Sequence, residues 1–136
     1  MTKLAPGLTG ESTMLVQAKH TASHLGRGSG GVDVLATPIM IGLMEDAARR
    51  LVDPLLDPGQ MTVGVNLNIT HLAPTPVGMQ VTARAELVTV DGRWLTFKVE
   101  AFDDKGKIGE GTHTRSIIDL ERFMAKARGK NSGRGS

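Results

Sequence analysis

One segment of the chain is apolar on every face of a helix, and this segment limits the folds that are available. Thr37 and Pro38 are typical of a helix start, because threonine can cap free amide groups and proline suits the first turn. Residues 39–44 then read Ile-Met-Ile-Gly-Leu-Met, which places apolar side chains all round the helix. Such a helix is expected in the interior of the protein rather than on its surface.

The rest of the chain is dominated by patterns typical of β-strands. Residues 8–20 contain a first strand, and alternating apolar and polar residues predict further strands at 61–71, 81–90, 95–101 and 107–118. Asp91-Gly92 is typical of a tight hairpin turn, and Leu120, Phe123 and Met124 indicate a short closing helix. The order of strand, helix and four strands predicts the α+β fold class.

The strand at 61–71 is expected to have one apolar face. That face would carry the apolar residues of the alternation, which are Met61, Val63, Val65, Leu67 and Ile69. His71 continues the same alternation, so its imidazole is predicted to point toward the helix. The helix carries Glu45 directly after its apolar run, and a buried carboxylate needs a partner, a hydrogen-bonding network or a raised pKa. Helix and strand are therefore predicted to direct Thr37, Glu45 and His71 inward.

Composition indicates one ordinary domain without special chemistry. Its 136 residues fit a single domain at 1–128 followed by a disordered basic tail at 129–136. Some of the cations near the end of the chain could also hold the phosphates of coenzyme A; these cations are Arg122, Lys126, Arg128, Lys130 and Arg134. The absence of cysteine excludes disulfides and thiolate nucleophiles. No stretch resembles a signal peptide or a membrane span, so we expect a cytoplasmic protein. One tryptophan, three phenylalanines and no tyrosine argue against a nucleic-acid partner.

Three motifs lie in order between residues 34 and 130. They are Ala36-Thr37 with Gly42-Leu43-Met44-Glu45, Thr70-His71 with Ala73-Pro74-Thr75-Pro76, and Gly109-Glu110-Gly111-Thr112-His113-Thr114-Arg115. In these motifs the chain resembles the hot-dog-fold thioesterases, and most closely the fluoroacetyl-CoA thioesterase family. The resemblance implies an antiparallel β-sheet wrapped around one central helix. It also implies that Thr37, Glu45 and His71 are catalytic, and that Gly64 and Arg115 bind the acyl end of the substrate.

One segment departs from that family. Fluoroacetyl-CoA thioesterases have phenylalanines that form a hydrophobic lid just before the helix, whereas residues 26–31 read Gly-Arg-Gly-Ser-Gly-Gly here. A glycine-rich backbone cannot form an aromatic gate. The resemblance therefore supports the catalytic group of the family more than its fluorinated substrate.

Each candidate site residue also has an ordinary structural interpretation. Thr37 can be only an N-cap, and His71 can be a core histidine whose hydrogen bonds are satisfied. Gly64 can mark a bulge or a close contact, and Arg115 can point outward from its strand. Capping does not explain Glu45 and His71, so the three residues together favour a functional site. The remaining histidines lack the spacing of a metal site, and we predict no metal and no role for His20, His24 and His113.

Helix geometry separates two of the candidate catalytic residues. Glu45 follows Thr37 by eight residues, so their backbones lie about 12 Å apart along a helix, too far for a direct hydrogen bond. Hot-dog proteins commonly form dimers with their sheets side by side. We therefore expect a homodimer, or a higher homo-oligomer, in which two chains build each site.

The predicted function is hydrolysis of a short or small acyl-CoA thioester without a cofactor. Thr37 is then the nucleophile or the group that orients water, Glu45 the base or the nucleophile's partner, and His71 the acid or base. Backbone amides near residues 38–40 are candidates for binding the thioester oxygen. The alternative is a non-catalytic acyl-CoA binding or sensing protein on the same scaffold. A dehydratase is a weaker choice, because the chain has no hydratase-type aspartate-histidine motif.

Overall fold

The computed structural model describes residues 3–26 and 30–132, and its element order agrees with the α+β prediction. The large helix α2 (Thr37–Val52) follows the first strand β1 (Thr9–Leu15) and the short elements η1 (Ala18–His20) and α1 (Ala22–Leu25). After η2 (Asp53–Leu55) come the four remaining strands, β2 (Gln60–His71), β3 (Gln80–Asp91), β4 (Trp94–Asp103) and β5 (Gly106–Asp119), and then helix α3 (Leu120–Ser132). The strand boundaries lie within two residues of those predicted.

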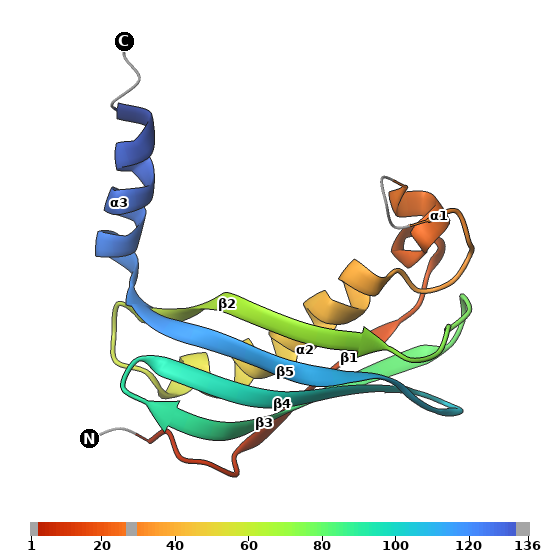
Figure 1. Cartoon of the computed structure of the whole chain (residues 1–136), viewed down its shortest axis with the longest axis horizontal. Helices are drawn as coiled ribbons and strands as arrows, with labels where there is room; N and C mark the ends of the chain where they lie inside the picture. Colours follow the sequence, from red (N-terminus) through yellow and green to blue (C-terminus); the bar gives the residue numbers. More distant parts are fainter. Residues whose placement is uncertain (1–2, 27–29, 133–136) are drawn as a thin grey trace.

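The strands form one antiparallel sheet in the order β1-β3-β4-β5-β2, and α2 lies across one face of it (Figure 1). Met40, Met44 and Ala47 of α2 are fully buried against apolar side chains of β3 and β4. The helix approaches the sheet closely, because a Cβ atom at Gly109 would lie 2.6 Å from the sulfur of Met40. The antiparallel sheet wrapped around one central helix is confirmed.

A β-bulge in β2 corrects the predicted apolar face of that strand. The register against β5 shifts between Gly64 and Asn66. After the bulge, Leu67, Ile69 and His71 face the helix side as predicted, since His71 pairs with Gly109 beneath Met40 and cross-strand partners share a face. Before the bulge the faces are exchanged, so Thr62 is buried beneath the helix and Val63 lies on the outer face. One extra residue thus reverses the alternation, as expected for a bulge.

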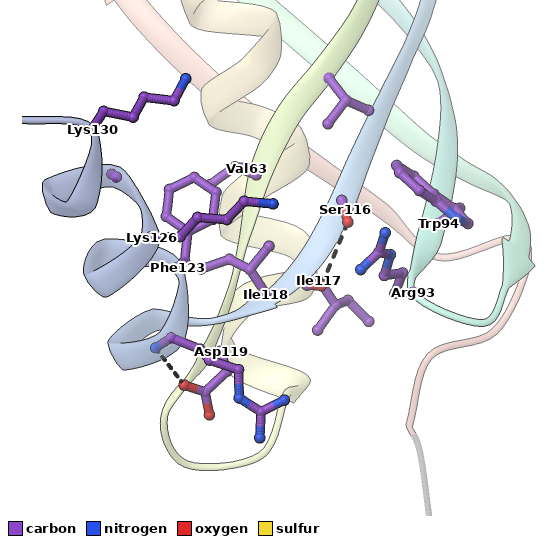
Figure 2. A pocket seen from close by; sticks show the side chains of 13 residues that line it. Val63, Arg93, Trp94, Ser116, Ile117, Ile118, Asp119, Phe123, Lys126 and Lys130 are labelled. Carbon is purple, nitrogen blue, oxygen red and sulfur yellow. Dashed lines mark hydrogen bonds between the residues drawn. The ribbon is translucent and has the colours of Figure 1, made fainter. Parts of the chain in front are cut away.

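The other face of the sheet carries a groove beside α3. Figure 2 shows this groove, about 640 Å³ in volume, between α3 and the ends of β2, β4 and β5. Its lining mixes apolar side chains such as Val63 and Phe123 with cations such as Arg122 and Lys126. None of the predicted site residues lines it.

Helix α3 projects from the sheet and is longer than predicted (Figure 1). It continues through residues 129–132, which we expected to belong to a disordered tail; residues 133–136 lie outside the described part of the chain. Good helix formers such as Lys126 and Ala127 extend it beyond Met124, the last large apolar residue. Among the described residues, no helix is both long and apolar enough to cross a membrane.

Candidate active site

Thr37 lies at the start of α2, but it does not cap the helix as predicted. The N-cap is Ala36, and Thr37 is the first helical residue, followed by Pro38. The exposed Thr37 hydroxyl instead lies 2.7 Å from Nδ1 of His71, the last residue of β2. The helix start and the strand end therefore bring two of the predicted catalytic residues into hydrogen-bond contact.

His71 has one ring nitrogen engaged and one without a partner. Nδ1 meets the Thr37 hydroxyl, whereas the buried Nε2 has no hydrogen-bond partner among the described residues. Burial lowers the pKa of His71 below its ordinary value of 6.5, although the backbone of Ala73 partly opposes this shift. The imidazole is therefore neutral near pH 7 and can accept a proton.

Glu45 lies two turns along α2, with its carboxylate against β2. A Cβ atom at Gly64 would lie 2.8 Å from Oε2 of Glu45, so only glycine lets the carboxylate occupy this position. The glutamate is 36% exposed, and its Oε2 lies 4.0 Å from Nη1 of Arg115. Glu45 is therefore less buried than predicted, and its ion pair with Arg115 is long.

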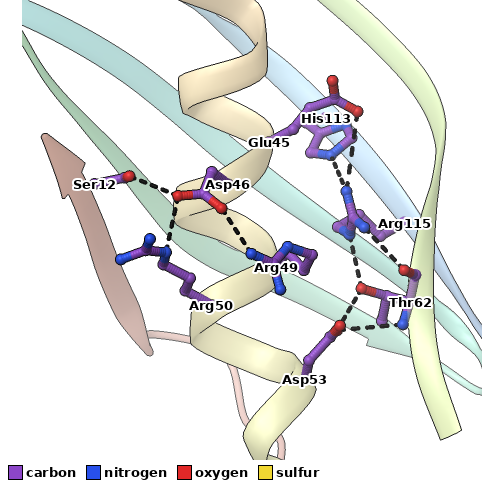
Figure 3. Close-up of polar contacts among 9 residues, drawn as sticks. All are labelled: Ser12, Glu45, Asp46, Arg49, Arg50, Asp53, Thr62, His113 and Arg115. Atoms are coloured by element: carbon purple, nitrogen blue, oxygen red, sulfur yellow. Dashed lines mark hydrogen bonds and ion pairs between the residues drawn. The ribbon is translucent and has the colours of Figure 1, made fainter. Parts of the chain in front are cut away.

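Arg115 points inward, toward α2, and not outward as its structural interpretation held. It is 5% exposed, because it pairs with Gly64 on the helix-facing side of the sheet. Its Nε donates to the Thr62 hydroxyl at 2.7 Å and its Nη2 to the Thr62 carbonyl at 2.9 Å, while that hydroxyl donates to Asp53 at 2.6 Å (Figure 3). Burial lowers the pKa of Arg115, and the carboxylates of Asp53 and Glu45 oppose this shift. The guanidinium is thus buried with polar partners on several sides.

His113 belongs to this group, although no role was predicted for it. It is fully buried beside Arg115, and its Nε2 lies 3.2 Å from Nη1 of Arg115 (Figure 3). A signal was present in the sequence: His113 precedes Arg115 by two residues on one strand, so both share a face. Glu110 and Thr112 occupy the opposite face of the same strand.

Within one chain, the candidate residues form two separate groups. The first contains Thr37 and His71, and the second contains Glu45, Gly64, His113 and Arg115. Helical rise places the backbones of Thr37 and Glu45 about 12 Å apart on α2. No hydrogen bond or ion pair within the described residues joins the two groups.

The amides at the start of α2 are not free, which contradicts their expected role toward the thioester oxygen. Those of Ile39 and Met40 both donate to the carbonyl of Ala36 at 3.1 Å, and Pro38 has no amide hydrogen. In the glycine-rich segment at 26–31, residues 27–29 lie outside the described part of the chain. Within residues 3–26 and 30–132, no group of three or more His, Cys, Asp or Glu side chains is arranged to hold a metal ion.

Comparison with known proteins finds thioesterases among the similar sequences and structures. Residues 16–121 match the family described as fluoroacetyl-CoA-specific thioesterase. A fluoroacetyl-CoA thioesterase of Streptantibioticus cattleyicolor is 48% identical over 98 residues, which cover 72% of this chain and 70% of that relative. A variant of the fluoroacetyl-CoA-specific thioesterase FlK, solved in complex with fluoroacetate and CoA, is 40% identical with a TM-score of 0.83, covering 88% of this chain and 99% of that one. A hypothetical protein of Thermus thermophilus from the thioesterase superfamily is 27% identical with a TM-score of 0.89, covering 97% of this chain and 96% of that one.

These matches confirm the resemblance seen in the three sequence motifs. The family match spans most of the chain, and the structural match covers 88% of it. The chain therefore belongs to the fluoroacetyl-CoA-specific thioesterases, a family of thioester hydrolases with the hot-dog fold.

Proposed function

We propose that this protein hydrolyses a coenzyme A thioester of a short or small acyl group, using Thr37, Glu45 and His71 as catalytic residues. The observation that carries the proposal is the 2.7 Å contact between the Thr37 hydroxyl and a neutral His71, in a chain of this family. A relative in the family has been solved with CoA and fluoroacetate bound, which supports an acyl-CoA substrate. A cytoplasmic location stays a prediction.

The Thr37–His71 pair supplies proton transfer at one end of the site. In hydrolysis a water oxygen forms a bond to the thioester carbon, the carbon–sulfur bond breaks, and a proton passes to the departing thiolate. A neutral imidazole can take a proton from the Thr37 hydroxyl, or from water that this hydroxyl orients, and can later return it to sulfur. Loss of either side chain removes this route for the proton.

Glu45 supplies a carboxylate at the other end of the site. Arg115 lies 4.0 Å from one of its oxygens, and the missing side chain of Gly64 makes room for it. A carboxylate held in this way can act as a base toward water or as a nucleophile toward the acyl carbon. Gly64 and Arg115 then lie beside the acyl end of the substrate.

The two ends belong to one site if two chains combine. Strand β2, which carries His71 and Gly64, is an edge strand of the sheet and leaves a free edge for a second copy. Val65 and Leu67 are 48% and 43% exposed on this strand, as expected for residues that a partner covers. In a homodimer paired at β2, Thr37 and His71 of one chain would face Glu45 of the other.

A mixed dimer tests this sharing. Thr37→Ala and Glu45→Ala subunits are each expected to be inactive as homodimers. A mixed dimer regains one complete site of the two, so its activity per dimer should be about half that of the wild-type dimer. Differently tagged subunits would be co-expressed and the mixed species purified before the assay. A mixed dimer without activity would count against shared sites.

Thiol release from a panel of acyl-CoAs tests the function itself. Acetyl, fluoroacetyl, short branched and aromatic thioesters would be offered to the wild type and to His71→Ala. Hydrolysis by the wild type that disappears in the variant supports the proposal, and the preferred thioester identifies the substrate class. No release from any thioester, together with thermal stabilisation by a CoA ester, would instead indicate a non-catalytic binding protein. Glu45→Ala separates the two functions, because a thioesterase should lose thiol release while still binding the thioester.

A further inference from the structure

His113 is a buried polar residue for which the proposed mechanism has no use. Its ring stacks on Phe97 with 6.1 Å between the ring centroids, deep in the core. Its Nδ1 lies 2.9 Å from the carbonyl oxygen of Asn66, and its Nε2 lies 3.2 Å from Nη1 of Arg115. Both ring nitrogens therefore have protein partners.

These partners fix the tautomer of the imidazole. A carbonyl oxygen only accepts hydrogen bonds, so Nδ1 must carry the proton toward Asn66. A guanidinium only donates, so Nε2 must present its lone pair to Arg115. Only the neutral Nδ1–H form satisfies both partners, and burial, which lowers the pKa of His113, favours the neutral ring.

The bonds of Arg115 keep it away from Glu45. Two of its nitrogens donate to Thr62 and the third donates to His113, while the distance from Nη1 to Oε2 of Glu45 remains 4.0 Å. Ion pairs elsewhere in the chain close fully, to 2.8 Å for Arg50–Asp46 and 2.7 Å for Lys107–Glu100. The Arg115–Glu45 pair is thus open although both side chains lie side by side.

We propose that His113 is a positioning residue that, together with Thr62, holds Arg115 back from Glu45 and so keeps a carboxylate oxygen free for catalysis. The proposal rests on the proposed function, in which Glu45 acts on the thioester. Without the His113 acceptor, the Nη1 group of Arg115 can close on Glu45 through a charge-assisted hydrogen bond. Such a bond stabilises the carboxylate and makes it a weaker base and nucleophile.

Two substitutions of His113 separate its two hydrogen bonds. His113→Gln places an amide oxygen near the position of Nε2 and can keep the acceptor for Arg115. His113→Asn places an amide nitrogen near the position of Nδ1 and can keep the donor to Asn66. We expect His113→Asn to lower kcat about 10- to 100-fold with KM nearly unchanged, and His113→Gln to retain most of the wild-type kcat.

The opposite ranking would overturn the proposal. If His113 only anchors the bulge of β2 through Asn66, His113→Asn retains activity and His113→Gln loses it. Melting temperatures show whether a loss of activity comes from unfolding. They would be measured for both variants and for His113→Phe, which keeps an aromatic ring but has neither ring nitrogen. In an Arg115→Gln background, His113→Asn should cause no further loss of kcat, because it acts through Arg115; additive losses would contradict the proposal.

Two measurements need no substrate and keep the proposal testable if the wild type releases no thiol. Nitrogen NMR of the wild type should show His113 as the Nδ1–H tautomer, and a protonated Nε2 would overturn the proposal. A crystal structure of His113→Asn should show Arg115 in direct contact with Glu45, and an unchanged separation would also overturn it. An inactive wild type would therefore count against the proposed function alone.

Discussion

The two groups of candidate residues differ in how fully their polar atoms are satisfied. At the Thr37–His71 pair, the hydroxyl is exposed and Nε2 of the histidine has no partner within the described residues. Around Arg115, hydrogen bonds run from Asp53 through Thr62 and the guanidinium to His113 and on to the backbone of the bulge. The first pair can still form hydrogen bonds to a substrate, whereas the polar groups of the Arg115 network are bonded to one another.

This difference assigns different roles to the two groups. A group that moves protons must keep an accessible donor or acceptor, at some cost to stability. A group that fixes the position of a charge is most useful when each of its own bonds is made. We therefore expect substitutions at the first pair to change activity more than stability, and those in the Arg115 network to change both.

Thr37→Val is expected to give the largest separation between activity and stability. Valine has nearly the same shape but no hydroxyl, so His71 loses the side-chain hydrogen bond that it makes to Thr37. We expect kcat to fall about 100- to 10,000-fold, which is the usual contribution of positioned proton transfer. The melting temperature should hardly change, because Thr37 is exposed and does not cap the helix. A variant with full activity would remove Thr37 from the mechanism.

Gly64→Ala probes how the second group holds Glu45. The added Cβ atom would lie 2.8 Å from Oε2 of Glu45 and 3.3 Å from Cε1 of His113, so the carboxylate must move. A displacement of this size is expected to lower kcat/KM about 100-fold. Gly42→Ala on α2 is the matched control, since nothing lies within 4 Å of its added Cβ atom. The control should gain up to about 1 kcal/mol in stability from helix propensity. Equal activities of the two variants would show that the position of Glu45 is unimportant.

Thr62→Val tests the same chemical change as Thr37→Val, but inside the network. Valine leaves Nε of Arg115 and the carboxylate of Asp53 without the hydroxyl that joins them. We expect the free energy of unfolding to fall by about 1–3 kcal/mol, the usual cost of an unpaired buried polar group. Urea denaturation of both valine variants measures this difference. If Thr37→Val proves as destabilising as Thr62→Val, the contrast between the two groups is not real.

The sequence predicted the elements of this fold better than the faces of its strands. Local periodicity located the start of α2 and the bounds of four strands within two residues, because these patterns depend only on neighbouring residues. The bulge between Gly64 and Asn66 depends on the pairing of β2 with β5, so it could not be found from β2 alone. As a result, Val63 was predicted on the helix-facing side although it lies on the outer face, and the burial of Thr62 was not predicted.

The site was likewise predicted where its chemistry is local. The motifs pointed to Thr37, Glu45 and His71, and the structure places the first and the last in hydrogen-bond contact, while their catalytic role stays a prediction. His113 was missed because a histidine on a strand has no distinctive spacing, and only the register with Leu67 and Phe97 places it in the core. Glu45 lies away from His71 within one chain, because His71 contacts Thr37 and Glu45 follows Thr37 by eight residues on α2. This separation could be predicted from the sequence.

The pH dependence of stability gives the smallest expected effect and involves both groups. Burial lowers the pKa of His71 and of His113, opposed in part by backbone acceptors at Ala73 and Asn66. For His113, Arg115 also lowers the pKa, whereas Glu45 raises it. In the unfolded chain both rings titrate near 6.5, so below that pH the unfolded state binds more protons than the folded state. Stability from these histidines is therefore present above about pH 6.5 and is lost as the pH falls below it.

Unfolding free energies measured by urea denaturation should decrease as the pH is lowered from 7.5 to 5, and His113→Gln should make this decrease shallower. A stability that rises on acidification in this range would show that the rings are charged in the folded protein, contrary to the tautomer that Asn66 and Arg115 require.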